Sequence, residues 1–323
     1  MSGVSTSARP QATSPVLLLT FNRPDTTAQV IDALREVRPQ HVFVFSDGPR
    51  DGVEGERELV EASRAVIDKE IDWDPRIERR LNDANQGLFA GVTGALDWFF
   101  SRVPEGIILE DDCVPNPDFF AYCDELLERY RDDERVWCIS GDNSMDLPIS
   151  GNASYGFIRD PLIWGWATWA RAWKQFDPDL TSWQDIRGTA AERELYPDRV
   201  ERRVRRDTLD RYLDSGIDAW GFRWKYTVHR HHGLVAVPRV NLVSNIGWNR
   251  ADATHTTGSS LRAAKPTEAI LPLQHPGEVS LDVAADREWV ESRGLGVKKY
   301  RLAYQVTKRI GRVRRGLGRM VGR

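Results

Sequence analysis

The sequence predicts an α/β fold in which a mostly parallel central sheet is flanked by helices. Short apolar runs alternate with amphipathic helical patterns over residues 14–145, as in repeated strand–helix–strand units. Turn-forming residues follow several of these runs, where a strand would end in a loop. The chain has 323 residues, of which 41% are hydrophobic and 29% charged, so it is long enough for one large domain or two halves sharing a core. A doubly wound sheet is the architecture that best fits these observations.

The elements of the first half follow from hydrophobic spacing. Runs of apolar residues predict buried strands at residues 16–20, 42–45, 107–109 and 136–139, and residues 77–81 could form a further short strand. Apolar residues three and four positions apart predict helices around residues 30–34, 54–69, 88–99 and 117–130. The last of these helices has a clear start, because Asn116 is a favourable N-cap and Pro117 suits the first turn.

The composition changes after residue 145. Residues 146–260 are rich in Trp, Gly and His, with strand-like pieces at 154–158 and 234–238 and a charged helix at 198–215. We expect a leader at 1–14, a first half at 15–145, a second half of the same domain at 146–260, and an extension at 261–323. Residues 1–14 are mostly polar or small, and they lack the basic-then-apolar order of a signal peptide. We therefore expect a disordered leader.

The three cysteines and the hydropathy pattern argue against a disulfide-rich, zinc-binding or membrane-spanning protein. Cys113, Cys123 and Cys138 are odd in number and form no C-x-x-C pair, which disfavours a disulfide framework or a structural zinc site. No apolar run approaches the roughly 20 residues that cross a bilayer. A reducing, cytoplasmic environment fits these features.

Positive charge is concentrated at the C-terminus. Residues 298–323 carry ten of the 45 basic residues and no acidic residue, which leaves 35 basic and 48 acidic residues elsewhere, a net charge of −13. Such a block is typical of a solvated tail, a nucleic-acid arm or a membrane-surface anchor. The acidic body disfavours nucleic acid, and apolar residues every three or four positions suit a helix on an anionic membrane surface.

Three consecutive carboxylates are the most informative feature. Glu110, Asp111 and Asp112 directly follow the predicted strand 107–109. Ligands of open α/β sheets bind at the carboxyl ends of the strands. Carboxylate oxygens suit Mg²⁺ or Mn²⁺, which can bridge the phosphates of a nucleotide. A metal-bound diphosphate is therefore one interpretation, and an acidic turn is the other.

Several motifs occur in the order of a known family. They are Leu-Leu-Thr-Phe-Asn-Arg-Pro at 18–24, Phe-Ser-Asp-Gly-Pro at 45–49, Leu-Glu-Asp-Asp at 109–112, Trp-Gly-Trp-Ala-Thr-Trp at 164–169, and Asn-Ile-Gly-Trp from 245 with Asp-Ala-Thr-His-Thr at 252–256. Together, over residues 15–257, they resemble the metal-dependent glycosyltransferases of GT-A fold. The chain looks most like bacterial family-2-type sugar transferases related to N-acetylglucosaminyltransferase I. The resemblance implies a Rossmann-like sheet, a nucleotide-sugar-binding first half and a Trp-rich, acceptor-binding second half.

The resemblance also implies roles for the donor half. Asp112 would be the direct metal ligand, with Asp111 near the ribose or the metal-bound waters and Glu110 toward the donor sugar. Asp47 would contact the uracil edge, and Arg23 the diphosphate. A carboxylate can accept a base N–H and a guanidinium can bind phosphate oxygens, although both residues also suit ordinary loops.

Two groups of histidines have different expected roles. The resemblance makes His255 a second candidate for the metal, either as a ligand or as a donor to the diphosphate; a surface-loop histidine is the alternative. His229, His231 and His232 lie in a basic segment. We expect them on a solvated helix face rather than in a zinc cluster, because spacing alone does not establish convergent geometry.

An inverting transfer needs a general base. Asp218 matches the family's acidic position before a tryptophan, but the second Asp of many relatives is replaced here by Gly221, so Asp214 remains a competitor. An ordinary carboxylate at a helix end is the alternative.

Three nearby tryptophans offer flat apolar faces that could contact a sugar or acceptor. They are Trp164, Trp166 and Trp169. Burial in the core is the alternative.

The sequence as a whole predicts an inverting glycosyltransferase that uses Mn²⁺ or Mg²⁺. The donor would be a nucleotide sugar, with UDP the expected nucleotide, and the acceptor a glycan or lipid-linked glycan at the inner face of the plasma membrane. A nucleotidyltransferase is a rival, but residues 18–30 lack a Gly-rich phosphate loop with an activating Lys. A glycan-binding scaffold without turnover is the non-enzymatic rival.

Overall fold

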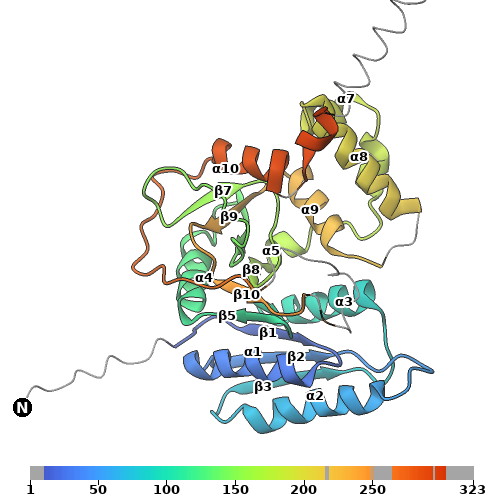
Figure 1. The fold of residues 1–323 in the computed structure, drawn as a ribbon, viewed down its shortest axis with the longest axis vertical. Helices are drawn as coiled ribbons and strands as arrows, with labels where there is room; N and C mark the ends of the chain where they lie inside the picture. Colours follow the sequence, from blue (N-terminus) through green and yellow to red (C-terminus); the bar gives the residue numbers. More distant parts are fainter. Residues whose placement is uncertain (1–10, 215–217, 249, 251–263, 294, 303–323) are drawn as a thin grey trace, which may run out of the picture.

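A computed structural model describes residues 11–214, 218–248, 250, 264–293 and 295–302 (Figure 1). Its centre is an eight-stranded sheet with the order β3-β2-β1-β4-β8-β6-β9-β7, beside a two-stranded sheet of β10 and β5. The strands are β1 Val16–Thr20, β2 His41–Ser46, β3 Arg76–Leu81, β4 Glu105–Glu110, β5 Cys113–Pro115, β6 Val136–Ser140, β7 Tyr155–Ile158, β8 Trp166–Trp169, β9 Leu234–Pro238 and β10 Val243–Asn245. The predicted α/β class with a central sheet flanked by helices is confirmed.

Helices lie on both faces of the large sheet and extend beyond its β9–β7 end (Figure 1). They are α1 Pro24–Val37, α2 Glu56–Glu70, α3 Leu88–Phe100, α4 Pro117–Arg129, α5 Ala170–Trp173, α6 Thr181–Ile186, α7 Ala190–Leu195, α8 Arg199–Asp214, α9 Gly221–Arg230, α10 Val283–Glu288 and the π-helix Trp289–Arg293. The predicted start of α4 is confirmed, because the Asn116 side chain accepts a hydrogen bond from the Phe119 N–H.

Successive side chains of each strand point to opposite faces of the sheet, and they form two hydrophobic cores. In β1, Val16 and Leu18 join a cluster with α1 and α4, whereas Leu17 and Leu19 join a cluster with α3 and α9. Successive side chains of a strand point to opposite faces, so a strand buried on both faces must be apolar throughout. The continuous apolar runs of the sequence therefore mark the interior of this sheet.

The first half of the sheet is parallel, and the second half is mixed. β1 pairs in parallel with β2 and β4, and β2 with β3. β8 then pairs antiparallel with both β4 and β6. Four of the seven pairings in the large sheet are parallel, since β6 and β9 are parallel and β7 and β9 antiparallel.

Two terminal segments are attached more closely than their composition indicates. Ala12 is 2% exposed, and the Asp124 carboxylate accepts the N–H groups of Thr13 and Ser14, so the prediction of disorder does not hold for these residues. The rest of the predicted leader, residues 1–10, lies outside the described residues. Near the other end, Trp289 returns to the core beside α9. None of the described helices is long and apolar enough to cross a membrane.

Candidate active site

A cleft of about 700 Å³ lies at the carboxyl ends of the parallel strands. Loops after β1, β2 and β4 form one part of its lining, and residues 218–222 at the start of α9 form another. The cleft brings together most of the candidates from the sequence, namely Arg23, Asp47, Glu110, Asp111, Asp112, Trp164 and Asp218. The parallel pairing of β1 with β2 and β4 explains the convergence, because these strands all end at the same edge.

The acidic turn after β4 holds more negative than positive charge. The Asp111 carboxylate accepts the Phe21 N–H at 3.0 Å. A nitrogen of the Arg23 guanidinium lies 2.9 Å from the Asp112 carboxylate. Burial, followed by repulsion from Asp112 and Asp111, raises the pKa of Glu110 to about 8 despite the opposing effect of Arg23. Burial also raises the pKa of Asp112.

This donor set suits a hard divalent cation that is shared with a substrate. Among the described residues, no group of three or more His, Cys, Asp or Glu side chains is arranged to hold a metal ion. Mg²⁺ and similar ions are commonly held by one or two carboxylates together with substrate phosphates. Asp112 lines the cleft and could supply such a carboxylate, and a cation would relieve the repulsion around it.

The two-stranded sheet fixes the position of Asp112. β10 pairs with β5, which follows the acidic turn directly, and the Asp112 carbonyl accepts the Ile246 N–H at 2.8 Å. The Asn245 amide lies 3.4 Å from the Asp112 carboxylate. A Cβ atom on Gly247 would lie only 1.9 Å from an oxygen of that carboxylate. Sequence reasoning gave no role to Asn245 or Gly247, and the Asn-Ile-Gly spacing is the only signal that could have indicated one.

We expect Gly247→Ala to displace the Asp112 carboxylate and to weaken Mn²⁺-dependent nucleotide binding at least about tenfold, because even a 1 Å misplacement in a site is costly. Isothermal titration of UDP with and without Mn²⁺ measures the effect. Gly277→Ala is the matched control, since nothing lies within 4 Å of the Cβ that it would add. Equal affinities in the two variants would contradict the prediction.

Asp47 lies in the cleft lining, but its carboxylate already has several donors. It accepts hydrogen bonds from the N–H groups of Gly48 and Gln86 and from the side-chain amides of Asn82 and Asn85, at 2.9 to 3.1 Å. It is 8% exposed. Asp47 therefore organises the loop that follows β3, and a contact with a nucleotide base remains a prediction.

Asp218 is held at the beginning of α3. Its two carboxylate oxygens accept the N–H groups of Leu88 and Phe89 at 2.7 and 2.6 Å, in the position where helices favour negative charge. A Cβ on Gly87 would lie 2.8 Å from the same carboxylate, so a glycine leaves the room that Asp218 needs. The competing residue Asp214 is exposed at the end of α8 and does not line the cleft.

The three tryptophans have different environments. Trp166 and Trp169 are 1% and 2% exposed and belong to β8, in the middle of the large sheet. Neither lines the cleft. The predicted sugar contact is therefore not supported for these two residues, since their rings are packed in the core. Trp164 does line the cleft, where its ring packs edge-on against Trp248 with centroids 5.7 Å apart.

The histidine predictions have different outcomes. His255 lies outside the described residues, so its proposed contact with a metal stays a prediction. The expectation of a solvated face is wrong for His229, which is 4% exposed and whose Nδ1 lies 2.9 Å from the Tyr196 hydroxyl. His231 and His232 are exposed, as expected, but they lie in the turn after α9 and not on a helix face. The charged neighbours of His229 in the sequence obscured its burial at the end of α9.

His229 belongs to a buried group of charged residues. Asp160 and Arg205 form an ion pair at 2.8 Å, with side chains that are 3% and 8% exposed. Arg205 also contacts Glu201, at 2.8 Å. Burial opposes the charge on Asp160, but Arg205 and then His229 outweigh it and hold the pKa of Asp160 well below its usual range.

We expect Asp160→Asn to lower the free energy of unfolding by about 3–5 kcal/mol, because Arg205 would keep a buried charge without its main partner. The pKa of Asp160 is depressed below its usual 3.8, so its contribution is complete above that pH and is lost only as the pH falls through the folded-state value. The loss should therefore be similar at neutral pH and at about pH 5 by urea unfolding. Asp207→Asn on the exposed face of α8 is the control, with an expected change within about 0.5 kcal/mol. Similar losses in both variants would argue against the buried pair.

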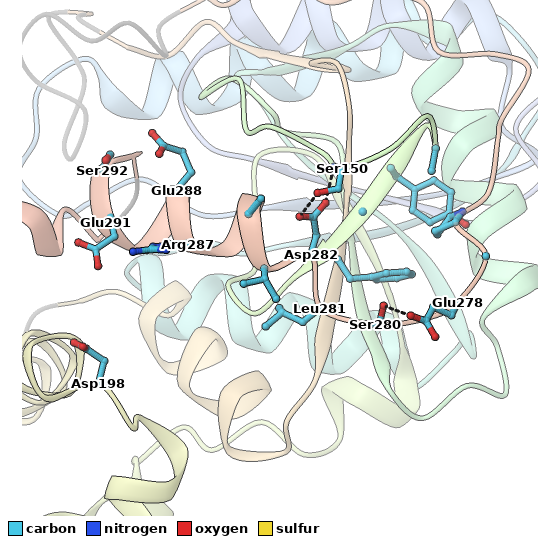
Figure 2. A pocket seen from close by; sticks show the side chains of 18 of the residues that line it. Ser150, Asp198, Glu278, Ser280, Leu281, Asp282, Arg287, Glu288, Glu291 and Ser292 are labelled. Atoms are coloured by element: carbon cyan, nitrogen blue, oxygen red, sulfur yellow. Dashed lines mark hydrogen bonds between the residues drawn. The ribbon is translucent and has the colours of Figure 1, made fainter.

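A larger cavity of about 1310 Å³ lies elsewhere, beside the edge strand β7 (Figure 2). Several of its polar groups already have partners within the chain. Asp282 accepts hydrogen bonds from Ser150, and Arg301 pairs with both Glu291 and Asp198. Its acidic lining residues, Asp198, Glu278, Asp282, Glu288 and Glu291, are separated along the chain, unlike the three consecutive carboxylates 110–112. The smaller cleft is therefore the better candidate for chemistry.

Comparisons with known proteins do not assign the chain to a family. No family model and no curated protein matches it. Among solved structures, it is similar to glucosyl-3-phosphoglycerate synthase from Mycobacterium tuberculosis in complex with Mn²⁺, UDP and phosphoglyceric acid, with 13% identity and a TM-score of 0.27. That similarity covers 49% of this chain and 56% of the other.

Proposed function

We propose that the protein is an inverting, divalent-metal-dependent glycosyltransferase of GT-A type that uses a nucleotide sugar, with UDP as the nucleotide. The observation that carries the proposal is the convergence in one cleft of Arg23, the turn Glu110–Asp112 and Asp218. The sequence motifs that resemble the GT-A family contribute Arg23 and Glu110–Asp112, and Asp218 matches the acidic position of that family before a tryptophan. Transfer of a sugar from a nucleoside diphosphate needs three kinds of group. An acidic group holds the cation, a cationic group binds the diphosphate, and a proton acceptor takes the proton of the acceptor hydroxyl.

The reaction would be a single displacement. The acceptor oxygen forms a bond to the anomeric carbon of the donor sugar while the bond from that carbon to the diphosphate oxygen breaks. The acceptor proton passes to the Asp218 carboxylate, and the electron pair leaves with the nucleoside diphosphate. A divalent cation bound at Asp112 supplies Lewis-acid stabilisation to the developing negative charge.

The residues of the chain have separate tasks in this scheme. Arg23 can bind diphosphate oxygens, since it lies in the cleft beside Asp112. The amides of Leu88 and Phe89 orient the Asp218 carboxylate, and each oxygen keeps acceptor capacity for the hydroxyl of a substrate. Trp164 is the one of the three tryptophans that we retain as a candidate for contact with a sugar ring. The acceptor would be a glycan or a lipid-linked glycan.

Two alternatives predict different activities. A nucleotidyltransferase would release pyrophosphate from a nucleoside triphosphate, and a glycan-binding scaffold would release nothing. A glycosyltransferase would release UDP from a UDP-sugar only when the cation is present. Product release with and without Mn²⁺ therefore separates the three. The membrane contact predicted for residues 298–323 stays a prediction, because most of that segment lies outside the described residues.

We expect Asp112→Asn to remove most Mn²⁺-dependent UDP binding while the protein stays folded, because an amide is a much poorer ligand for a hard cation than a carboxylate. Titration calorimetry with UDP, repeated in EDTA, isolates the metal-dependent part of the affinity. Asp83→Asn, on the exposed loop after β3, is the control. Unchanged metal-dependent affinity in folded Asp112→Asn would remove Asp112 from the cation site.

We expect Asp218→Asn to lower kcat by about 10²–10⁴-fold with little change in UDP affinity, because an amide cannot take the acceptor proton. The matched control is Asp214→Asn, which alters the exposed competitor outside the cleft. UDP release under saturating donor gives the rates. Normal turnover in Asp218→Asn, or a larger loss in Asp214→Asn, would assign the base elsewhere.

A further inference from the structure

The Arg23 guanidinium covers one oxygen of the Asp112 carboxylate. It donates a hydrogen bond of 2.9 Å to Oδ2, and the two side chains are 14% and 13% exposed. The other oxygen, Oδ1, lies 3.4 Å from the Asn245 amide and 3.5 Å from the Cys113 thiol, and both of these residues are buried. Arg23 and Asp112 line the cleft. Oδ2 is therefore the oxygen that a group from the cleft contacts, and Arg23 already contacts it.

A divalent cation at Asp112 competes with this ion pair. Both positive groups would contact the same carboxylate, and like charges so close together repel strongly where water is scarce. Without a further anion, the cation must either break the hydrogen bond from Arg23 or bind against the charge of the guanidinium. Each course lowers the affinity of the site for the cation.

A diphosphate relieves this competition, because it offers Arg23 another acceptor. Phosphate oxygens accept two parallel hydrogen bonds from a guanidinium, and such charged pairs are among the stronger hydrogen bonds in proteins. When the guanidinium contacts the diphosphate, Oδ2 of Asp112 becomes accessible from the cleft. The phosphate oxygens then also supply negative charge for the cation.

The exchange requires movement of the side chain alone. The Arg23 carbonyl accepts hydrogen bonds from the Thr27 N–H at 3.0 Å and from the Thr27 hydroxyl at 2.7 Å, at the start of α1. These bonds hold the main chain of Arg23 in place. The long side chain beyond the Cα atom has several rotatable bonds, so the guanidinium can change partner while the loop keeps its conformation.

We propose that Arg23 is an exchangeable counter-ion, which makes cation binding and nucleotide binding depend on each other. Without nucleotide it neutralises Asp112 and disfavours the divalent cation, and with nucleotide it moves to the diphosphate and exposes Asp112. The cation then enters and leaves the cleft together with the nucleotide. This inference rests on the proposed glycosyltransferase function, and it adds a regulation of the same site that the transfer reaction does not itself require.

The first test measures the affinity for Mn²⁺ alone by titration calorimetry. Arg23→Met removes the guanidinium and keeps an unbranched side chain, and Arg23→Gln is a second variant that keeps a polar one. We expect each to bind Mn²⁺ about tenfold more tightly than the unmodified protein, because the cation no longer competes with a hydrogen bond between charged groups. Arg57→Met, which removes an exposed arginine of α2, is the matched control and should leave the affinity unchanged.

The second test measures how much saturating UDP raises the affinity for Mn²⁺. In the unmodified protein the increase has two sources, the contact of the cation with phosphate and the release of Asp112 by Arg23. Only the first source remains in Arg23→Met, so the increase should be about tenfold smaller, as reciprocal linkage requires. Combining Arg23→Met with Asp112→Asn should remove the gain for Mn²⁺ alone, because the extra affinity belongs to the Asp112 carboxylate.

Unchanged or weaker binding of Mn²⁺ alone in the folded Arg23 variants would overturn the exchange and leave the proposed function standing. The same holds for a gain that persists without the Asp112 carboxylate. Failure of the unmodified protein to bind UDP with Mn²⁺ would overturn the proposed function, and the exchange with it.

Discussion

Burial of acidic side chains at the end of β4, together with the repulsion that Asp112 and Asp111 exert on Glu110, is the constraint on which the candidate site depends. Glu110, Asp111 and Asp112 lie at the end of a buried strand, where water screens their charges poorly. Arg23 offsets part of this charge through its contact with Asp112, yet the pKa of Glu110 remains raised. A fold rarely keeps such a cluster unless a ligand uses it, and a cation that bridges to phosphates would remove the repulsion.

Strand β8 joins the two halves of the molecule around this cluster. It lies between β4, which carries the acidic turn, and β6, which leads to the strands of the second half. Its residues are fully buried, so the relative position of the halves is set inside the sheet rather than by a linker. Asp218 then reaches across to α3, where two backbone amides receive it. Groups from the two parts of the chain are thereby held together in the cleft by hydrogen bonds.

Sequence reasoning was most successful where a local pattern determines the structure. The buried strands of the first half, the cap at Asn116 and the position of the carboxylates at a strand end all follow from short-range signals. Sequence reasoning was less successful where contacts between residues distant in sequence determine the position or burial of a residue. Strand β8 is hidden among closely spaced tryptophans, and its central place depends on two partners that are distant in sequence. The burial of His229 depends on Tyr196 and Asp160, which no spacing within α9 could indicate. Nor could a pattern show that Gly247 must leave room for Asp112.

β3 and β7 are the edge strands of the large sheet, and each is protected differently against pairing with another chain. β3, with the sequence Arg-Ile-Glu-Arg-Arg-Leu, carries mainly charged side chains, which disfavour pairing with a strand from another molecule. At the opposite border, the Phe157 carbonyl in β7 accepts the N–H of Asp282, and the Ser154 N–H before β7 donates to the Gln274 carbonyl. The chain segment leading to α10 thus occupies backbone groups that would otherwise face solvent. Removing that segment would expose the hydrogen-bonding edge of β7 and should promote pairing with strands of other molecules.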